Sequence, residues 1–580
     1  MAGATAGSQG RSVVTVMLSD RTLVRWLLVL VAAVAALVLG YIGLSGYLAH
    51  QPSPPQFGRS WADILFYDVQ LFVFNAAPTQ GAGPFPVALG IARFLAPATT
   101  VVATVETVRL LLSEQLRRWS TASAANHAVV TGDGAVAVEL ARKLRTEYRK
   151  VVLVSADPLT AEQARRHHLL DVFGDLADPG TLRAAGLGRA DVLYACGELS
   201  AANAATALRG REIAQSHDRK LTTYAQVRDA EICMALRARR IGANGDMRFR
   251  LEFFAVEDTA ARVLLDRYPP AGGSGQPTQA AIIGFGRLGR AVLREIARRR
   301  APDSPPFNVR IRGAEAGTVS DFLDLFPVIR RNCSVTCDGD APPQPASDAP
   351  SLTIVCLPSN DDALTAGLAA ADSVAARSGR VVICMSEPSP FGAVLGGDRA
   401  LLDDVEGRLT VFEVIEEACV PGRIREDLDD QLARAIHRTY VKNCAARGDS
   451  PHVNKSMRPW EQLPDDLKRS NLAQAADIGT KLNAIGCAVI PESANAPSFS
   501  FRDGEIELLA KLEHQRWMQE REAQGYVLGP TREGKQHPSL VDWQNLPESE
   551  KEKDRDAIRE LPSILGEAGF QILRLPARPV

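Results

Sequence analysis

Near its start the chain carries 23 consecutive residues without a charge, from Trp26 to Leu48. A helix rising 1.5 Å per residue would make this segment about 35 Å long, enough to cross a bilayer. A cleaved signal peptide has a shorter apolar region and a small-residue cleavage site, which the residues after Gly46 do not provide. We therefore predict a membrane span here.

A second apolar stretch runs from Val87 to Leu112 and contains four residues unusual in a span: Arg93, Pro97, Glu106 and Arg109. Charges within a span usually face protein or water. Glu106 and Arg109 are three residues apart and are expected to pair near the inner end. The alternative is a buried helix of a soluble domain.

Arginines flank the two stretches on one side. They precede the first and follow the second, whereas the intervening loop holds Arg59 alone. The positive-inside rule then places both termini and the large C-terminal part in the cytoplasm, with two spans in a bacterial inner membrane. The flanking residues are Arg11, Arg21, Arg25, Arg117 and Arg118.

Between the stretches, residues 61–72 predict a short, mostly apolar helix, followed by Thr79-Gln80-Gly81-Ala82-Gly83. This order resembles two-span potassium channel subunits, whose T-x-G-Y-G filter replaces the hydration shell of the ion with carbonyl groups. Thr79, Gly81 and Gly83 keep the spacing, but Ala82 stands in place of the tyrosine. The resemblance implies a pore at Thr79, Gly81, Gly83 and Glu106 with a permeant cation, potassium being the candidate. A plain G-x-G loop is the alternative.

Composition narrows the class of the remaining chain. With 580 residues the chain needs several domains. Lys and Arg number 66 against 68 Asp and Glu, so the basic excess of a nucleic-acid binder is missing. Nine scattered cysteines without a C-x-x-C pair indicate free, buried thiols in a reducing compartment. We expect neither a disulfide framework nor a metal site.

After Trp119 short apolar runs alternate with amphipathic segments. Residues 128–131 predict a strand, Gly132-Asp133-Gly134 opens a helix reaching about Tyr148, and residues 150–155 predict the next strand. Glycines at such a turn allow close approach of a pyrophosphate to the helix N-terminus. Asp157 follows the second strand, where an acid would meet a ribose hydroxyl.

The residues that follow narrow the prediction of the fold. Gly174-Asp175, Asp178-Pro179, Leu182 and Ala185-Gly186 form the pattern G-D-x-x-D-P-x-x-L-x-x-A-G. This resembles the regulator-of-conductance (RCK, or TrkA-N) family of potassium channels and transporters. The resemblance implies that Gly132, Gly134, Asp157 and Asp175 bind a nucleotide, NAD or ATP. Ser155 falls where the family usually has its ribose acid. The alternative is a Rossmann fold that mediates subunit contacts alone.

A second Rossmann-like unit is predicted after a flexible linker at residues 271–275. A strand at 280–283 leads into Gly284-x-Gly286-x-x-Gly289 and an arginine-rich helix. Further strands are expected at 351–356, 380–385 and 408–412, with a low-complexity loop at 341–345. Gly284, Gly286 and Gly289 are candidate nucleotide ligands, although no ribose acid ends the strand at 309–312.

The last 150 residues contain an internal duplication. Leu432, His437, Tyr440 and Gly448 match Leu509, His514, Trp517 and Gly525 at an offset of 77. Trp460, Leu463, Pro464, Leu482 and Gly486 match Trp543, Leu546, Pro547, Leu565 and Gly569 at an offset of 83. Two copies of helix, loop, W-x-x-L-P and helix are predicted, with six extra residues in the second loop. A cleft between such copies is a natural ligand site.

The second copy resembles the RyR repeat of ryanodine receptors. The resemblance rests on Glu513-His514-Gln515-Arg516-Trp517, Gly525-Tyr526, Gly529-Pro530, His537-Pro538, Trp543 and Leu546-Pro547. His514, Trp517 and Arg521 share one helix face. With Tyr526 and Trp543 they are candidates to stack on a nucleotide-like effector. The alternative is that the aromatic residues form the small core and His514 bonds a buried backbone group.

These features predict a multidomain chain: a two-helix transmembrane region, two α/β Rossmann-like domains and a mainly α duplicated domain. The expected boundaries are a tail at 1–25, the membrane region at 26–113, a first RCK/TrkA-N domain at 124–270, a second Rossmann domain at 278–425 and the RyR-like pair at 430–575.

The predicted function is a ligand-gated cation channel, working as a homo-oligomer, by analogy a tetramer, in the lipid bilayer. A membrane-anchored nucleotide sensor that conducts no ions is the alternative. An NAD-dependent oxidoreductase is disfavoured, because no Tyr-x-x-x-Lys or comparable proton donor follows either glycine motif.

Overall fold

The computed structural model describes the chain from residue 20 to residue 576. The ranges outside the description are 52–57, 76–78, 80–83, 218, 242–248, 271–277, 301–303, 339–349, 375–378, 388, 390, 392–408, 426–427, 451–453, 494–496 and 532–533. The predicted linker at 271–275 and loop at 341–345 therefore lie outside the described residues. The chain divides into two units, Met1–Trp119 and Ser120–Val580, and each is described by itself.

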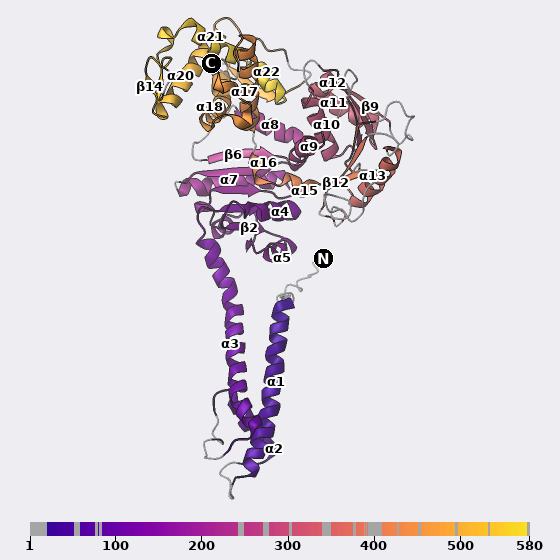
Figure 1. Cartoon of the computed structure of the whole chain (residues 1–580), viewed down its shortest axis with the longest axis vertical. Helices are drawn as coiled ribbons and strands as arrows, with labels where there is room; N and C mark the ends of the chain where they lie inside the picture. The colour runs from indigo at the N-terminus through magenta and orange to yellow at the C-terminus, as the bar shows by residue number, and fades with distance from the viewer. Residues whose placement is uncertain are drawn as a thin grey trace, which may run out of the picture. The chain divides into compact units, whose positions relative to one another are not determined.

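The described residues of the first unit include the helices α1 (Asp20–Ala49), α2 (Trp61–Leu71) and α3 (Val87–Ala122), the last of which continues into the second unit. Figure 1 shows α2 beside the end of α1 and the start of α3. Val24–Ala49 and Val87–Arg109 are long and apolar enough to cross a membrane. Their large apolar side chains are mostly exposed, as with Leu27 at 59% and Val31 at 58%. An apolar helix surface of this kind fits lipid or a neighbouring subunit.

A capping box starts α2. The Ser60 hydroxyl accepts a hydrogen bond from the Asp63 amide at 3.2 Å, and the Asp63 carboxylate accepts one from the Ser60 amide at 3.0 Å. The helix ends one residue before the predicted end, at Leu71. Small residues let the helices approach closely: a Cβ on Gly43 would lie 2.4 Å from the Leu89 amide. The buried core of this unit comprises Ala36, Leu44, Tyr47, Leu48, Ile64, Leu71, Leu89, Ala92 and Ala96.

The second unit begins with a six-stranded parallel sheet in the order β3-β2-β1-β4-β5-β6, which is the doubly wound Rossmann topology. Its strands are β1 (Ala128–Thr131), β2 (Val151–Ser155), β3 (Leu170–Phe173), β4 (Val192–Ala195), β5 (Leu221–Gln226) and β6 (Phe249–Phe254). Its helices are α4 (Ala135–Leu144), α5 (Pro158–Arg166), α6 (Pro179–Ala184), η2 (Leu187–Arg189), α7 (Ser200–Ser216), α8 (Ala230–Ile241) and α9 (Val256–Arg267).

A second parallel sheet repeats this topology in the order β12-β11-β10-β7-β8-β9, which confirms the predicted tandem of Rossmann-like units. Its strands are β7 (Gln279–Ile283), β8 (Phe307–Arg312), β9 (Cys333–Cys337), β10 (Leu352–Val355), β11 (Arg380–Met385) and β12 (Leu409–Glu413). Its helices are α10 (Arg287–Arg298), α11 (Ala316–Leu325), α12 (Pro327–Asn332), α13 (Asn360–Val374), α15 (Val414–Ala418) and α16 (Pro421–Arg425).

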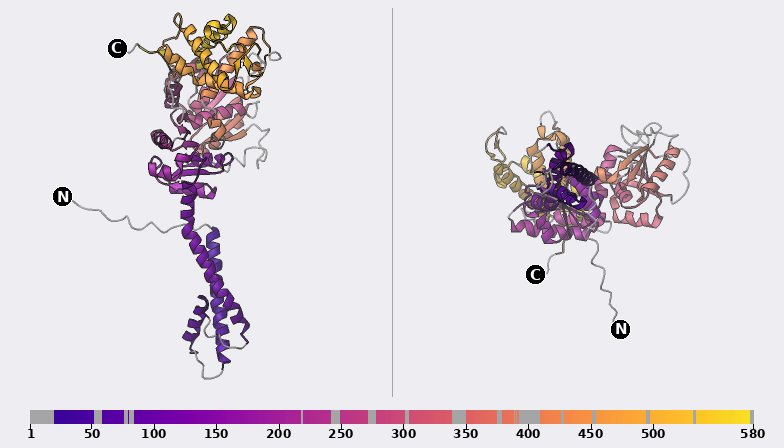
Figure 2. Two further views of the ribbon diagram at one scale, coloured as in Figure 1. Left: turned by 90° about the vertical axis from the view of Figure 1, so that its left-hand side faces the viewer. Right: turned by 90° about the horizontal axis from the view of Figure 1, so that it is seen from below.

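The C-terminal helices form one cluster, drawn in orange and yellow in Figure 2. Their spans repeat at the offsets found in the sequence. The first copy holds α17 (Leu428–Ala446), η4 (Lys455–Met457), η5 (Trp460–Gln462), α18 (Asp465–Ala476), α19 (Ile478–Ala484) and β13 (Cys487–Pro491). The second holds α20 (Glu505–Ala523), β14 (Val527–Leu528), β15 (Gln536–His537), η6 (Trp543–Asn545), α21 (Glu548–Arg559), α22 (Leu561–Glu567) and β16 (Phe570–Arg574).

The two copies are related by an approximate two-fold axis. Strands β13 and β16 pair antiparallel, and Val489 lies opposite Ile572, its own counterpart at an offset of 83. Because equivalent residues face each other at this position, the axis passes through this pair. The duplication is therefore a packed symmetric pair of copies with one shared core.

Helix α8 joins the first Rossmann-like unit to this pair. Its residues Met234, Ala238 and Ile241 belong to the same buried core as the C-terminal helices. At its end the Arg240 guanidinium bonds both carboxylate oxygens of Asp429 on α17, at 2.8 and 2.7 Å. The start of α8 follows β5, at the carboxyl edge of the first sheet.

Candidate nucleotide-binding site

The first glycine of each motif allows a close approach to the neighbouring strand. Gly132 and Gly284 have φ angles of +151° and +92°. A Cβ on Gly132 would lie 2.7 Å from the Cys196 backbone, and one on Gly284 would lie 2.8 Å from the Cys356 carbonyl oxygen. A Cβ on Gly289 would lie 2.2 Å from the Gly284 carbonyl oxygen, so this glycine permits close packing of helix and strand.

The second glycine of each motif faces open space. A Cβ on Gly134 or Gly286 would meet no heavy atom within 4 Å. Gly134 is the N-cap of α4 and Gly286 that of α10. Backbone amides at a helix N-terminus favour a bound phosphate, and these two positions are where such a group reaches the backbone.

Both positions line the same cavity, with a volume of about 470 Å³. The cavity lies at the carboxyl ends of β1 and β4 in one sheet and of β7 and β10 in the other, the points at which the strand order reverses. Ligands of doubly wound folds bind at these points, and the volume suits a nucleotide. The lining includes Asp133, Gly134, Cys196, Gln226, Arg228, Glu257, Gly286, Arg287, Cys356, Ser386, Glu387 and Val414.

Charged side chains from both Rossmann-like units meet in this cavity. The Arg287 Nε atom lies 3.1 Å from Glu257 Oε1, which links the start of α10 to α9. Burial raises the pKa of Glu257 above its usual range. Its Oε2 atom is buried without a hydrogen-bond partner in the described part of the chain. Arg228 and Glu257 were not predicted from the sequence, whereas Arg287 lies inside the predicted glycine motif.

Asp157, the predicted ribose acid, caps a helix in the structure. The Asp157 carboxylate caps α5, accepting from the Thr160 hydroxyl at 2.8 Å and from the Thr160 and Leu159 amides at 2.9 and 3.3 Å. The Thr160 hydroxyl and these amides hold the pKa of Asp157 below its usual range. Neither Asp157 nor Asp175 is among the residues lining the cavity. Asp175 is exposed and accepts from the Ala177 amide.

Asp133, inside the first glycine motif, fills the end of β2. One carboxylate oxygen accepts from the Ala156 and Asp157 amides at 3.0 Å each and from the Ser155 hydroxyl at 2.6 Å. The Gly134 amide donates to the Thr160 hydroxyl at 2.9 Å. The polar groups that would receive a ribose in the first Rossmann-like unit are therefore satisfied by the chain itself.

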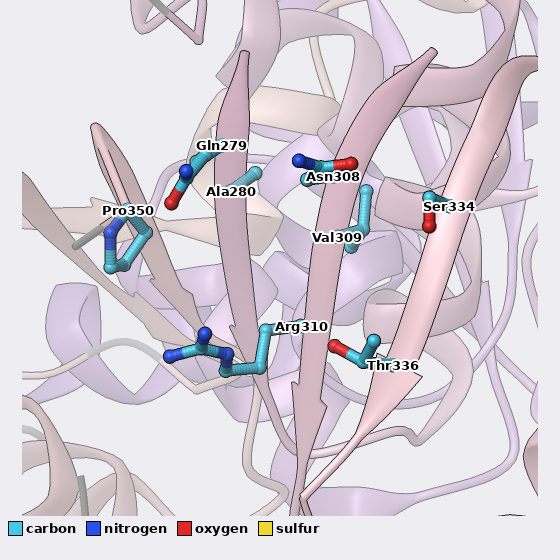
Figure 3. A pocket seen from close by; sticks show the side chains of 8 residues that line it. All are labelled: Gln279, Ala280, Asn308, Val309, Arg310, Ser334, Thr336 and Pro350. Atoms are coloured by element: carbon cyan, nitrogen blue, oxygen red, sulfur yellow. The ribbon is translucent and has the colours of Figure 1, made fainter. Parts of the chain in front are cut away.

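A second hollow, of about 260 Å³, lies over the face of the second sheet. Figure 3 shows Asn308 and Arg310 on β8 beside Ser334 and Thr336 on β9, which pair with them. The hollow begins at Gln279, the first residue of β7, away from the carboxyl ends that carry the glycine motifs. We therefore do not assign the nucleotide to it.

The aromatic residues of the second C-terminal copy lie together. His514 contacts the rings of Trp517 and Trp543, with centroids 5.7 and 5.8 Å apart, and the Arg521 guanidinium lies over Trp517 and Tyr526. His514 is 3% exposed and its Nε2 donates to the Val541 carbonyl at 2.8 Å. This hydrogen bond agrees with the alternative stated above, in which His514 bonds a buried backbone group.

The first copy repeats the arrangement. His437 Nε2 donates to the Arg458 carbonyl at 2.8 Å, and His437 and Trp460 have centroids 5.8 Å apart. The copies differ at the other histidine nitrogen: His514 Nδ1 lies 3.4 Å from Asp554, whereas Asn471 occupies the equivalent position in the first copy. The second copy alone therefore carries an acid at this histidine.

The structure describes two of the four predicted pore residues, Thr79 and Glu106. Thr79 is 4% exposed, whereas Gly81 and Gly83 lie outside the described residues. Glu106 forms the predicted pair with Arg109, at 3.4 Å, and also lies 3.5 Å from Arg25 on α1. Within the described ranges no group of three or more His, Cys, Asp or Glu side chains could hold a metal ion.

Comparisons with known proteins find matches over parts of the chain. Residues 128–245 match the TrkA-N domain and residues 503–574 match the RyR domain. Comparison with curated protein sequences gives no match. The chain is similar to the solved structure of GsuK bound to ADP, with 15% identity and a TM-score of 0.34, over 70% of this chain and 97% of that chain.

Two further solved structures are similar. The GsuK channel bound to NAD matches with 13% identity and a TM-score of 0.33, over 70% of this chain and 83% of that chain. The TrkA-N domain of the inner membrane protein ybaL from Escherichia coli matches with 22% identity and a TM-score of 0.20, over 25% and 98%. By its domain matches and its folds, the chain combines two candidate membrane helices with a TrkA-N domain, a second Rossmann-like unit and an RyR domain.

Proposed function

We propose that this chain is a nucleotide-regulated, channel-like membrane protein, in which a nucleotide bound between the two Rossmann-like units biases a cation pathway formed by the first unit. The observation that carries the proposal is the single cavity onto which Gly134 and Gly286 both open. A ligand that contacts both glycine motifs binds one arrangement of the two Rossmann-like units more tightly than others. Such a difference in affinity is the condition for regulation.

A continuous helix and two hydrogen bonds give this regulation a physical route. Helix α3 contains the second candidate span and continues to Ala122, where Thr121 is buried in the second unit. The Arg189 guanidinium bonds the Ala124 carbonyl at 3.1 Å, and the Asn126 amide bonds the Arg189 carbonyl at 2.9 Å. The segment after α3 is thus bonded to the loop before β4, one of the strands that end at the cavity.

The proposal also has more specific parts. We propose NAD or ATP as the nucleotide, potassium as the ion, a homotetramer, and both termini in the cytoplasm of a bacterial inner membrane. An effector is proposed to bind at His514, Trp517, Arg521, Tyr526 and Trp543, and the proposed domain boundaries are those predicted from the sequence. A membrane-anchored sensor that conducts no ions is the second candidate, favoured by Ala82 in place of the filter tyrosine.

Nucleotide binding to the full-length protein tests the central step. Calorimetry with NAD and with ATP would compare the wild type with Gly286→Ala, whose methyl group enters the cavity without a clash. We expect the wild type to bind one of the two nucleotides and the variant to bind it about tenfold more weakly, because the backbone no longer meets the phosphate. Gly317→Ala on α11, also free of clashes, is the control. Equal affinity in all three proteins would contradict the proposed site.

A further inference from the structure

Helix α2 places a carboxyl group inside the core of the first unit. Asp68 is 0% exposed, and neither of its carboxyl oxygens has a hydrogen-bond partner among the described residues. Burying an unpaired polar group is unfavourable, and burying an unpaired ionised group is far more so. A carboxyl group in such a place therefore indicates a function.

The carboxyl group lies against α1 at a glycine. A Cβ on Gly40 would lie 1.8 Å from Asp68 Oδ1, so the absence of a side chain at Gly40 makes the room for this acid. Gly40 is nine residues before Ala49, the end of the candidate span, which is about 14 Å along the helix axis. Helix α2 thus runs back along α1 to this depth, as a re-entrant helix does.

The part of this unit that the structure describes provides no counter-charge for an ionised Asp68. The buried core to which α1, α2 and α3 contribute is apolar. The nearest charged groups along these helices are engaged elsewhere: Asp63 caps α2, the Arg93 guanidinium lies over the Phe85 ring, and Glu106 pairs with Arg25 and Arg109. Among the residues of these helices whose side chains are described, the other titratable groups are Tyr41, Tyr47 and Tyr67. The rings of Tyr47 and Tyr67 contact those of Phe85 and Phe66.

We propose that Asp68 is a proton-binding site that holds α2 against α1. In this arrangement the carboxyl group carries a proton and is neutral. When the proton leaves to solvent, a carboxylate remains at a place with no partner, and α2 moves away from Gly40 so that water reaches the acid. Among the residues that the structure describes, no group of three or more His, Cys, Asp or Glu side chains could hold a metal ion here. The ligand in this proposal is therefore a proton.

The direction of the pH effect follows from this arrangement. If Asp68 binds a proton in the folded state and not in the unfolded state, the folded state becomes less stable as pH rises. The equilibrium constant for unfolding then increases by up to tenfold per pH unit. The effect begins above the ordinary pKa of aspartate, about 3.9, and ends at the folded-state value. Asp68→Asn keeps the shape of the neutral acid and removes the proton. Its unfolding equilibrium should therefore lack this component.

Infrared spectroscopy of the full-length protein in lipid tests the proposal without relying on conduction. We expect the wild type at pH 6 to show the carbonyl absorption of a protonated carboxyl group that Asp68→Asn lacks. Gly40→Ala should lose the same band, because the added methyl group displaces Asp68, whereas Gly46→Ala, whose Cβ meets Pro86 at an ordinary 3.9 Å, should keep it.

Ion flux from liposomes adds a separate readout: a channel whose flux varies with pH in the wild type and not in Asp68→Asn would agree with the proposal. A protein without flux would leave the infrared result to decide, so failure of the proposed function is distinguishable from failure of this site. A wild-type spectrum at pH 6 without a protonated band assignable to Asp68 would overturn the proposal.

Discussion

Lys481 Nζ lies 2.6 Å from Glu513 Oε2, and the two side chains are 2% and 5% exposed. The pair joins α19 of the first C-terminal copy to α20 of the second. At the symmetry-related positions, 83 residues after Lys481 and 77 before Glu513, the chain has Ile564 and Ile436, both buried in the same core. One half of the symmetric pair is therefore ionic where the other half is apolar.

This asymmetry predicts opposite results for single and double substitutions. Glu513→Ile leaves Lys481 buried without its nearest partner and should lower the free energy of unfolding by about 3–5 kcal/mol. The double variant Lys481→Ile, Glu513→Ile copies the pair found in the other half and should recover most of that loss. Denaturation of the full-length protein, followed by tryptophan fluorescence, measures both. A double variant as unstable as the single one would contradict this account.

The acid beside His514 predicts a pH dependence. Burial lowers the pKa of His514, but its bonds to Asp554 and to the Val541 carbonyl outweigh burial and raise it overall. Burial raises the pKa of Asp554. Both groups hold protons more tightly in the folded state, so stability falls as pH rises: for Asp554 above about 3.9, and for His514 above about 6.5 and through its folded-state value.

Asp554→Asn gives the second copy the residue type of the first, which has Asn471 at the position equivalent to Asp554. We expect the variant to flatten the decline in stability between pH 6 and pH 8, by about 1 kcal/mol or less. Thermal unfolding at a series of pH values measures the effect. A decline equally steep in the variant would show that the histidine and the aspartate are not coupled.

The contact between α8 and α17 predicts sensitivity to acid. Asp429 is 6% exposed and bonds Arg240 and, at 3.1 Å, Arg250. Burial raises the pKa of Asp429, but the arginines outweigh burial and lower it overall. Its contribution is therefore present above about pH 3.9 and is lost as pH falls through the lower folded-state value.

Asp429→Asn should lower the free energy of unfolding at pH 7 by about 2–3 kcal/mol, because the half-buried Arg240 and Arg250 lose one of their two carboxylate partners and keep only Glu252. Asp430→Asn is the matched control, since Asp430 pairs with Arg434 across one turn of the same helix with its side chain 22% exposed. The control should cost less than about 1 kcal/mol. Equal losses in the two variants at pH 7, measured by urea denaturation, would contradict the role assigned to Asp429.

Much of the fold could be predicted from the sequence because its signals are local or repeated. The constant offsets of 77 and 83 predicted which helices correspond, since a duplicated unit keeps its element lengths. The glycines of both motifs were identified for the same reason: a positive φ and a close backbone contact at Gly132 and Gly284 exclude other residues.

The candidate site was predicted less well because it depends on competition between partners. Asp157 stands at the right distance from the motif to meet a ribose, but it also stands where α5 begins, and the free amides of the helix take its carboxylate. Asp133 then fills the end of β2. Spacing in a sequence shows neither of these outcomes. The single cavity between Gly134 and Gly286 required the packing of two sheets, which no local pattern encodes.

Ion flux is the most direct test of the central claim that a nucleotide in the shared cavity regulates a cation pathway. Potassium and sodium flux would be measured from liposomes holding the full-length protein, with and without NAD or ATP, for the wild type, Gly286→Ala and Gly317→Ala. The account predicts cation flux that changes with nucleotide in the wild type and in Gly317→Ala but much less in Gly286→Ala. Absence of flux from the wild type under every condition, with nucleotide binding intact, would contradict it and favour the membrane-anchored sensor.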